Sequence, residues 1–252
     1  MASLSVTIIA KNEAHRIRDC LESVKWADEI IVLDSGSTDE TRAICREYTD
    51  KVFSTDWPGY GAQKNRALDY ATKQWILSID ADERLSPKLC AEIQAVIKSS
   101  HNFVYQIPRK SWYCGRFIRY GDWHSDYCLR LFQKGQGQFS LDPIHERVIA
   151  QGPIKKLQHE ILHLSFSNLE EVLDKLNHYS TLSAQMMYKK GKTASLSTAV
   201  GHGLWSFFRG YILRRGFLDG KEGLLLALSN SLGTFYRYSK LSYMTKNYEY
   251  NK

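Results

Sequence analysis

The first hundred residues alternate between short runs rich in β-branched residues and segments with helical spacing, and this alternation restricts the fold more than any other feature. The strand-like runs are Leu4–Ala10, Glu29–Asp34, Lys51–Ser54 and Trp75–Asp80. The helical segments cover residues 14–24, 37–48, 62–72 and 87–98. Strands that alternate with helices predict an α/β fold, with a largely parallel sheet covered on both faces.

The pattern changes after Phe103. Shorter aromatic and glycine-punctuated segments predict antiparallel strands at Tyr105–Trp112, Leu129–Phe132 and Arg147–Ile149. From Asn168 the spacing becomes helical. Capping boxes predict helix starts at Ser37/Glu40 and Ser167/Glu170. The Ser86-Pro87 pair predicts the start of the helix over residues 87–98. We expect a catalytic domain over residues 1–166 and a helical region over residues 167–252.

Charge is unevenly distributed along the 252 residues. The chain carries a net charge of +7, yet residues 189–252 alone hold 11 Lys/Arg against 3 Asp/Glu. A nearly neutral body with one basic end argues against nucleic acid as a partner and for a local anionic surface. Five cysteines without a CxxC pair indicate reduced thiols, as in a cytosolic protein. We expect neither a signal peptide nor a membrane-spanning helix.

Polar residues follow three of the predicted strands at the point where each ends. Lys11-Asn12-Glu13 follows the first, Asp34 the second, and Asp80-Ala81-Asp82 the fourth. Ligands of open α/β sheets bind at the carboxyl ends of the strands. Taken singly, Asp34 could be a turn residue and the Asp80–Asp82 segment an exposed loop. Because polar residues follow three strands at the same edge of the predicted sheet, a shared ligand-binding site is the better interpretation.

The Asp80-Ala81-Asp82 segment has the chemistry of a cation site. Alternate residues of an extended segment face the same way, so both carboxylates can project toward one point while Ala81 leaves room between them. Two carboxylates repel each other unless a cation joins them, and hard oxygen ligands select Mg²⁺ or Mn²⁺. Such a cation neutralises charge on a diphosphate leaving group.

These motifs together resemble family 2 glycosyltransferases. The matching segments are residues 5–13 (SVTIIAKNE), 34–39 (DSGSTD) and 80–83 (DADE). The resemblance implies a GT-A-type, Rossmann-like mixed sheet flanked by helices, with a C-terminal helical extension. It also implies a nucleotide-sugar site formed by Ala10, Asn12, Glu13, Asp34, Asp80 and Ala81, with Asp82 on the metal ion. Lys64, in a further matching segment (QKN), would contact the base or a phosphate of the nucleotide. The alternative interpretation is that Lys64 is an exposed lysine on a helix.

Later segments resemble the lipopolysaccharide-core β-1,4-glucosyltransferase branch. They are residues 130–132 (RLF), 142–147 (DPIHER), 176–180 (LNHYS) and 215–223 (RGFLDGKEG). The resemblance implies glucose transfer from UDP-glucose to inner-core heptose of a lipid-linked saccharide. The Gln-x-x-Arg-Trp signature of processive relatives is absent from the sequence, which favours one transfer per acceptor.

Within this branch, Glu146 takes the place of the general base. Inverting transfer needs a carboxylate that accepts the proton of the acceptor hydroxyl. We expect Arg130 to face the diphosphate and Trp123, His124 and His145 to contact the acceptor. A surface ion pair for Glu146 and aromatic core packing for Trp123 remain open.

The basic end combines aromatic residues with arginines. Residues 204–215 (LWSFFRGYILRR) are followed by a second apolar run at 223–228 (GLLLAL). Such composition suits helices that lie on anionic lipid, so we expect a peripheral protein on the cytoplasmic face of the inner membrane. Helices that pack together, or form a homo-oligomer interface, are the alternative.

Two other functions compete with this one. A dehydrogenase or methyltransferase would need a glycine-rich turn after the first strand, and the sequence has Ala-Lys-Asn-Glu there and no GxGxxG. A catalytically idle sugar-nucleotide-binding or membrane scaffold protein remains open, although Asp80, Asp82 and Glu146 together argue against it.

Overall fold

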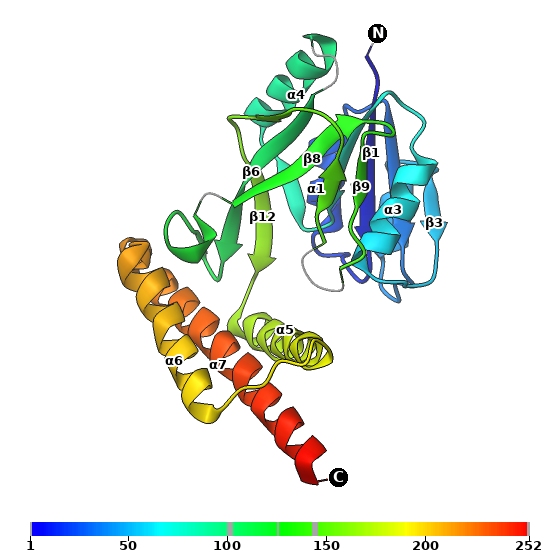
Figure 1. Cartoon of the computed structure of the whole chain (residues 1–252). Helices are drawn as coiled ribbons and strands as arrows, with labels where there is room; N and C mark the ends of the chain where they lie inside the picture. Colours follow the sequence, from blue (N-terminus) through cyan, green and yellow to red (C-terminus); the bar gives the residue numbers. More distant parts are fainter. Residues whose placement is uncertain (1, 100–102, 125, 143–145, 251–252) are drawn as a thin grey trace. The chain divides into compact units, whose positions relative to one another are not determined.

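The computed structural model describes residues 2–99, 103–124, 126–142 and 146–250 (Figure 1). Contacts divide the chain into two compact units. Unit 1 comprises Met1–Lys110 and Ser125–His163, and unit 2 comprises Ser111–His124 and Leu164–Lys252. This division differs from the expected boundary at residue 166 because the Ser111–His124 segment packs with the C-terminal helices.

The sheet of unit 1 has a parallel half and an antiparallel half. Its strand order is β3-β2-β1-β4-β8-β6-β12-β5. The parallel strands are β1 (Leu4–Ala10), β2 (Glu29–Asp34), β3 (Val52–Ser54) and β4 (Trp75–Asp80). The others are β8 (Asp126–Gln133), β6 (Val104–Tyr113), β12 (Ile161–Phe166) and β5 (Glu83–Leu85). The short strands β7 (Arg116–Phe117) and β11 (Ile154–Lys156) pair with β6, and β9 (Gly137–Phe139) pairs with β10 (Val148–Ala150).

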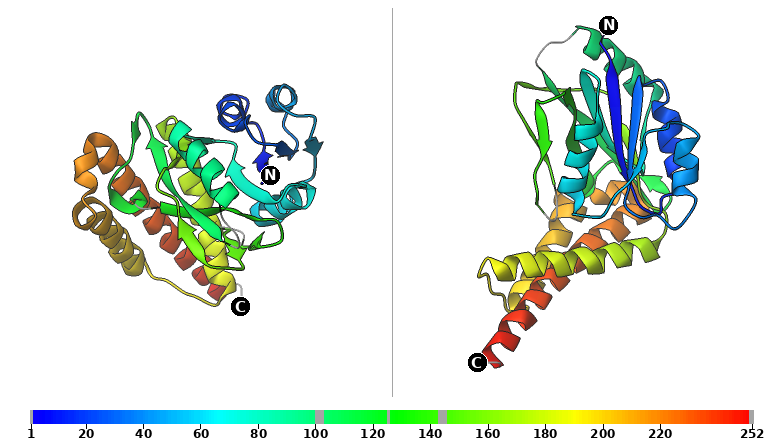
Figure 2. Two further views of the ribbon diagram at one scale, coloured as in Figure 1. Left: turned by 90° about the horizontal axis from the view of Figure 1, so that it is seen from above. Right: turned by 90° about the vertical axis from the view of Figure 1, so that its right-hand side faces the viewer.

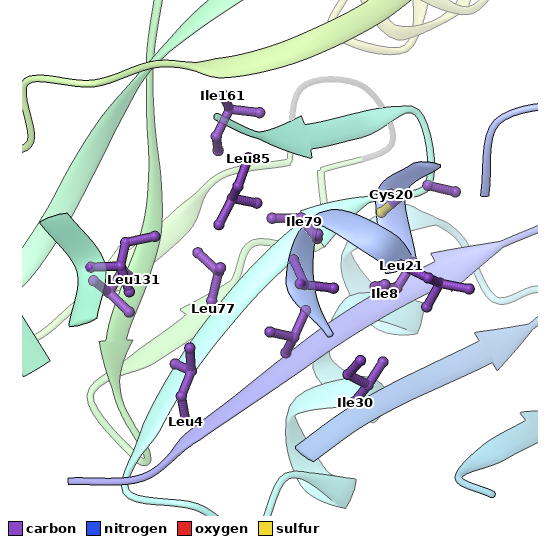
Figure 3. Close-up of a cluster of buried hydrophobic side chains, with 14 of the residues drawn as sticks. Leu4, Ile8, Cys20, Leu21, Ile30, Leu77, Ile79, Leu85, Leu131 and Ile161 are labelled. Atoms are coloured by element: carbon purple, nitrogen blue, oxygen red, sulfur yellow. The ribbon is translucent and has the colours of Figure 1, made fainter. Parts of the chain in front are cut away.

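Helices cover both faces of the parallel strands. Val6 and Ile8 of β1 pack in the cluster that contains α1 (Ile17–Val24), α2 (Thr41–Arg46) and α4 (Pro87–Ser99). Ile9 faces the opposite side, against α3 (Tyr60–Tyr70). Figure 2 shows α3 across the strands from α1 and α2, and Figure 3 shows Ile8 and Ile79 packed against Cys20 and Leu21 of α1. The continuous apolar runs therefore belong to strands buried on both faces, as expected.

Two of the predicted helix starts are displaced. Ser37 does not cap α2; its Oγ accepts a hydrogen bond from the Asn12 N–H instead, and α2 begins at Thr41. Helix α5 (Leu169–Lys189), which was predicted to be capped by Ser167, is capped by Asn168 instead. Ser86 caps α4 as predicted, since its Oγ accepts from the Leu89 N–H.

Unit 2 consists of the Ser111–His124 segment and three long helices. It contains η1 (Gly121–Trp123), α5, α6 (Leu196–Phe207), the π-helical η2 (Phe208–Leu213), η3 (Gly216–Asp219) and α7 (Gly220–Tyr250). Helix α7 packs against both α5 and α6. Buried Asp219 accepts hydrogen bonds from the backbone N–H groups of Arg119 and Tyr120, which fastens the segment to the helices. Among the described residues, none of the helices is long and apolar enough to cross a bilayer.

Candidate active site

The register of the parallel strands brings the predicted nucleotide residues to one edge of the sheet. Ala10 pairs with Asp34, and Ile9 pairs with Asp80, so β1, β2 and β4 end side by side. The Ala10 carbonyl accepts a hydrogen bond from the Ser35 N–H. Asp34 and Asp80 therefore share one edge of the sheet, as the strand phasing predicts.

The loops after β1 and β2 are tied together by short polar contacts. Asn12 adopts a left-handed backbone with φ of 55°, and its Oδ1 accepts from the Thr38 N–H at 2.8 Å. The Glu13 N–H donates to Thr41 Oγ1, also at 2.8 Å. Asparagine tolerates a positive φ better than most residues, so the turn itself accounts for Asn12 at this position. These bonds fix the shape of the edge at which a ligand would bind.

Asp34 is fully buried and only half of its carboxylate is satisfied. Oδ2 accepts hydrogen bonds from the N–H groups of Gly36 at 3.1 Å and Ser37 at 3.0 Å. Oδ1 is buried and makes no hydrogen bond within the part of the chain that the structure describes. Because a buried carboxylate oxygen without a partner costs free energy, this atom is suited to accept from a ligand N–H or O–H group.

Gln63, which the sequence did not single out as a site residue, provides a second buried hydrogen-bond acceptor. Its Nε2 donates to Ser35 Oγ at 2.9 Å and to Thr55 Oγ1. Its Oε1 is buried and forms no hydrogen bond to a described residue. The QKN segment in which it lies pointed to this helix, but only the packing of α3 against the end of β2 distinguishes Gln63 from its neighbours.

Asp80 lies between two cations. Lys64 Nζ is 2.7 Å from Asp80 Oδ1, and Arg130 Nη2 is 2.6 Å from Asp80 Oδ2. Burial alone would raise the pKa of Asp80, but Arg130 and Lys64 outweigh it and hold this pKa well below its usual range. Two cations of the protein therefore neutralise the Asp80 carboxylate, whereas Asp82 is the carboxylate predicted to bind the metal ion.

Lys64 also contacts the predicted general base. Its Nζ lies 2.8 Å from Glu146 Oε1, and both side chains are largely shielded from solvent, at 4% and 16% exposure. The reading of Lys64 as an exposed helical lysine is excluded. The structure therefore joins α3, β4 and the segment before β10 through one ammonium group.

Helix α3 is held close to the segment that carries Glu146. Asn65 exchanges two hydrogen bonds with the backbone of Phe139, at 2.9 and 2.7 Å. A Cβ at Gly61 would lie 1.9 Å from the Ser140 carbonyl oxygen, so only glycine permits this approach. The contact between Lys64 and Glu146 follows from this clamp.

Glu83 forms hydrogen bonds with both Asp80 and Arg130. Its buried carboxylate accepts from the Asp80 N–H at 2.9 Å and from Arg130 Nη2 at 3.0 Å. Arg109 Nη1 lies 3.5 Å from the same carboxylate and also pairs with Asp126. Arg130 thus binds two carboxylates of the protein, and the sequence signal for Glu83 was its place next to the Asp80–Asp82 pair.

Asp82 has a different partner from Asp80. Its Oδ2 lies 3.3 Å from Nε2 of His163 on β12, and both side chains are mostly buried. Ala81 between the two aspartates is 5% exposed. No group of three or more metal-ligating side chains occurs among the described residues. A carboxylate and an imidazole nonetheless fit a Mg²⁺ or Mn²⁺ site that is completed by substrate phosphates and water. The sequence reasoning missed His163.

The structure describes two of the three predicted acceptor residues, Trp123 and His124, and both belong to unit 2. Trp123 belongs to unit 2, where its ring packs against Tyr113 and Phe166. His124 is exposed, with its Nδ1 2.7 Å from the Arg119 carbonyl oxygen. Core packing thus accounts for Trp123, whereas His145 lies outside the described residues.

Comparison with known proteins identifies the family. The model of "Glycosyl transferase family 2" matches residues 5–157. The chain belongs to glycosyl transferase family 2. An uncharacterized glycosyltransferase of Rickettsia felis is 34% identical over 96% of this chain and 90% of its own length. This confirms the predicted family, and with it the α/β fold of the GT-A type that the mixed sheet displays.

Other relatives extend the glycosyltransferase comparison. The lipopolysaccharide core biosynthesis glycosyltransferase LpsC of Rhizobium meliloti is 28% identical, over 94% of this chain and 91% of its own length. Glucosyl-3-phosphoglycerate synthase from Mycobacterium tuberculosis, solved with Mg²⁺ and UDP, is 26% identical over 44% of each chain, with a TM-score of 0.37. The match to the family model and the relatives by sequence support glycosyltransferase activity for this chain.

Proposed function

We propose that this family 2 glycosyltransferase transfers a hexose from a UDP-sugar, with inversion, to a lipid-linked saccharide. The observation that carries the proposal is the contact of Lys64 with both Asp80 and Glu146 at the sheet edge where Asp34 is buried. It unites the candidate base with the aspartate motif. A catalytically idle binding protein would have no need for a carboxylate held in this place.

Asp34 and Gln63 would recognise the nucleotide. Each presents a buried oxygen without a hydrogen bond to the described residues, and both lie where β2 ends or packs against α3. Uracil offers an N–H donor and ribose offers hydroxyl donors, so two acceptors at this edge match a uridine nucleotide. Asn12 and Glu13 would shape the same edge through their contacts with Thr38 and Thr41.

Asp82 and His163 would hold the divalent cation. Their oxygen and nitrogen atoms provide two donors, which leaves the remaining coordination positions for the donor diphosphate and water. When bound, Mg²⁺ or Mn²⁺ supplies neutralisation of the negative charge on the leaving diphosphate. The nitrogen donor is better suited to Mn²⁺ than to Mg²⁺.

Glu146 would act as the general base. An acceptor hydroxyl oxygen forms a bond to the anomeric carbon as the bond from that carbon to the diphosphate oxygen breaks, and the hydroxyl proton passes to the Glu146 carboxylate. Lys64 keeps this carboxylate in place at the donor edge. Attack opposite the leaving group inverts the anomeric configuration.

The acceptor in this proposal is the inner-core heptose of lipopolysaccharide, and the donor sugar is glucose. The support is the LpsC relative, whose name refers to lipopolysaccharide core biosynthesis, together with the branch motifs in residues 130–223. Such an acceptor is assembled on lipid, so the proposal also includes work at the inner face of the cytoplasmic membrane.

The test is transfer from radiolabelled UDP-glucose to a heptose-terminated lipopolysaccharide acceptor with Mn²⁺ present. A panel of UDP-sugars in the same assay identifies the donor. We expect labelled acceptor with the wild-type protein, and at most residual label with Glu146→Gln. UDP binding without transfer or donor hydrolysis, across the whole panel, would instead support the idle sugar-nucleotide-binding protein.

A further inference from the structure

The exposed side of α6 is apolar and uncharged. Helix α6 contains no Asp, Glu, Lys or Arg. Leu196, Val200 and Leu204 recur at four-residue intervals, so they lie along one face, and Leu196 and Leu204 are 61% and 67% exposed. Trp205 beside them is 53% exposed. A water-facing helix surface is ordinarily polar, so this face is suited to a partner.

The exposed apolar residues continue through the connection into α7. The members in η2, in η3 and on α7 are Phe208, Ile212, Leu213, Phe217, Leu218, Leu224, Leu228, Leu232 and Tyr236. On α7 they again recur at four-residue intervals from Leu224 to Tyr236. We call the exposed residues from Leu196 to Tyr236 the α6–α7 apolar face.

The two helical rows lie on the same side of the pair. Gly203 of α6 packs against Phe235 of α7, and His202 stacks on Tyr238, so the helices run antiparallel. At about 100° per residue, Leu204 and Val200 are displaced from Gly203 by about 100° and about 60°. Tyr236 and Leu232 are displaced from Phe235 by the same angles, in the same rotational sense along the helix. In an antiparallel pair, rows displaced in the same sense face the same way. Figure 1 shows the two helices side by side.

The exposed charge between residues 191 and 245 is almost entirely positive. Between residues 191 and 245 the acidic residues are Asp219 and Glu222, whose side chains are 0% and 12% exposed. Lys192, Arg215 and Lys221 are exposed. Arg209 and Arg214 pair with Asp122 yet remain 40% and 51% exposed. Residues 191–245 therefore present cations and almost no exposed anions, whereas the exposed acids Glu170 and Asp174 of unit 2 lie on α5.

We propose that the α6–α7 apolar face docks on an anionic lipid surface. Leucine and aromatic side chains would enter the boundary between headgroups and acyl chains, and the lysines and arginines would contact the headgroups. A second copy of the chain is a poorer occupant, because a twofold interface would bring the same cations together without exposed acids to pair them. An acidic polymer would leave the leucines exposed. The inference does not depend on the proposed transferase reaction.

The test is co-sedimentation of the full-length protein with vesicles of phosphatidylethanolamine and phosphatidylglycerol, without donor or acceptor. We expect binding at low ionic strength that weakens as salt is added, and much weaker binding to phosphatidylcholine vesicles. Brominated lipid should quench fluorescence of the wild-type protein more than that of Trp205→Phe, because Trp205 enters the bilayer interface.

Two variants separate the apolar and charged contributions. Leu196→Gln/Leu204→Gln should reduce the vesicle partition coefficient at every salt concentration. Lys192→Glu/Arg215→Glu should reduce it by at least about thirtyfold at low salt. Exposed residues of unit 1 provide matched controls, and Ile154→Gln and Lys88→Glu should bind as wild type does. Arg209 and Arg214 are unsuitable, because reversing them would break their ion pairs with Asp122.

Several outcomes would overturn the proposal. These are wild-type protein that ignores anionic vesicles at low salt, equal binding to both kinds of vesicle, and variants that bind as wild type. A concentration-dependent dimer in size-exclusion chromatography that Leu196→Gln/Leu204→Gln dissociates would assign the face to a second copy instead. Melting curves of all variants ensure that lost binding does not reflect unfolding.

Discussion

Lys64 and Glu146 are 82 positions apart in the sequence, and their side chains meet at 2.8 Å. The same ammonium group lies 2.7 Å from Asp80. The candidate base is thus held by a group that also neutralises the first aspartate of the motif, so the base and the donor end of the sheet are coupled. A substitution at either carboxylate therefore also removes a contact of Lys64.

Replacing Glu146 by glutamine should remove the proton acceptor and keep the shape. We expect turnover to fall on the order of 10²–10⁴-fold while UDP affinity stays within about twofold, because the amide cannot accept the hydroxyl proton. Steady-state kinetics and calorimetry check both. Asp142→Asn is the matched control, since Asp142 is exposed and accepts from Ser140 Oγ. If Asp142→Asn loses turnover and Glu146→Gln does not, the base is Asp142.

Removing the Lys64 ammonium should destabilise the protein and shift its response to acid. The folded-state pKa of Asp80 is depressed, so its contribution to stability is present above the unfolded value of about 3.9 and is lost as pH falls through the folded pKa. Lys64→Met removes one of the two cations, which raises that pKa toward its usual range. We expect a loss of about 2–4 kcal/mol at pH 7 and acid unfolding that begins at higher pH.

Urea unfolding of Lys64→Met across the range from pH 7 to pH 3 measures both effects. Exposed Lys88 supplies the control, and Lys88→Met should unfold as wild type does. Equal stability of Lys64→Met and wild type at pH 7 would mean that Arg130 alone suffices for Asp80.

The affinity of the protein for UDP should depend on Asp34. Asp34→Asn replaces an anionic acceptor beside the loop N–H groups of Gly36 and Ser37. We expect UDP to bind more weakly by about 1.5–3 kcal/mol, with a smaller effect on the rate of bound substrate. Calorimetry with UDP is the measurement, and exposed Asp56→Asn is the control. Unchanged UDP affinity would remove Asp34 from the site.

Cation binding should require both Asp82 and His163. In Asp82→Ala and His163→Ala we expect half-saturating Mn²⁺ for UDP binding to rise at least tenfold, because each change removes one of the two protein donors. Chelation with EDTA should abolish transfer by the wild-type enzyme, and Mn²⁺ should restore it.

His159→Ala is the control for the cation experiment, since His159 pairs with Glu92 instead. Full transfer in excess chelator would refute metal dependence. If Asp82→Ala raises the half-saturating Mn²⁺ concentration and His163→Ala does not, Asp82 binds the cation and His163 does not.

The sequence by itself determined the parallel half of the sheet and the position of its edge. The apolar runs of β1, β2 and β4 are buried on both faces, and this burial fixes where Asp34 and Asp80 emerge. Those features depend on residues that are close in the chain, because strand period and strand ends are local properties. The order of motifs also sufficed for the family.

Only the tertiary structure decided which side chains meet. Lys64 reaches Glu146 because Asn65 and Gly61 hold α3 against the segment after β9, and Asp82 reaches His163 because β12 pairs with β5. The same holds for Asp219, which joins the Ser111–His124 segment to the helices. Each contact spans 80 or more residues, so no periodicity in the sequence encodes it; it arises from packing and strand pairing.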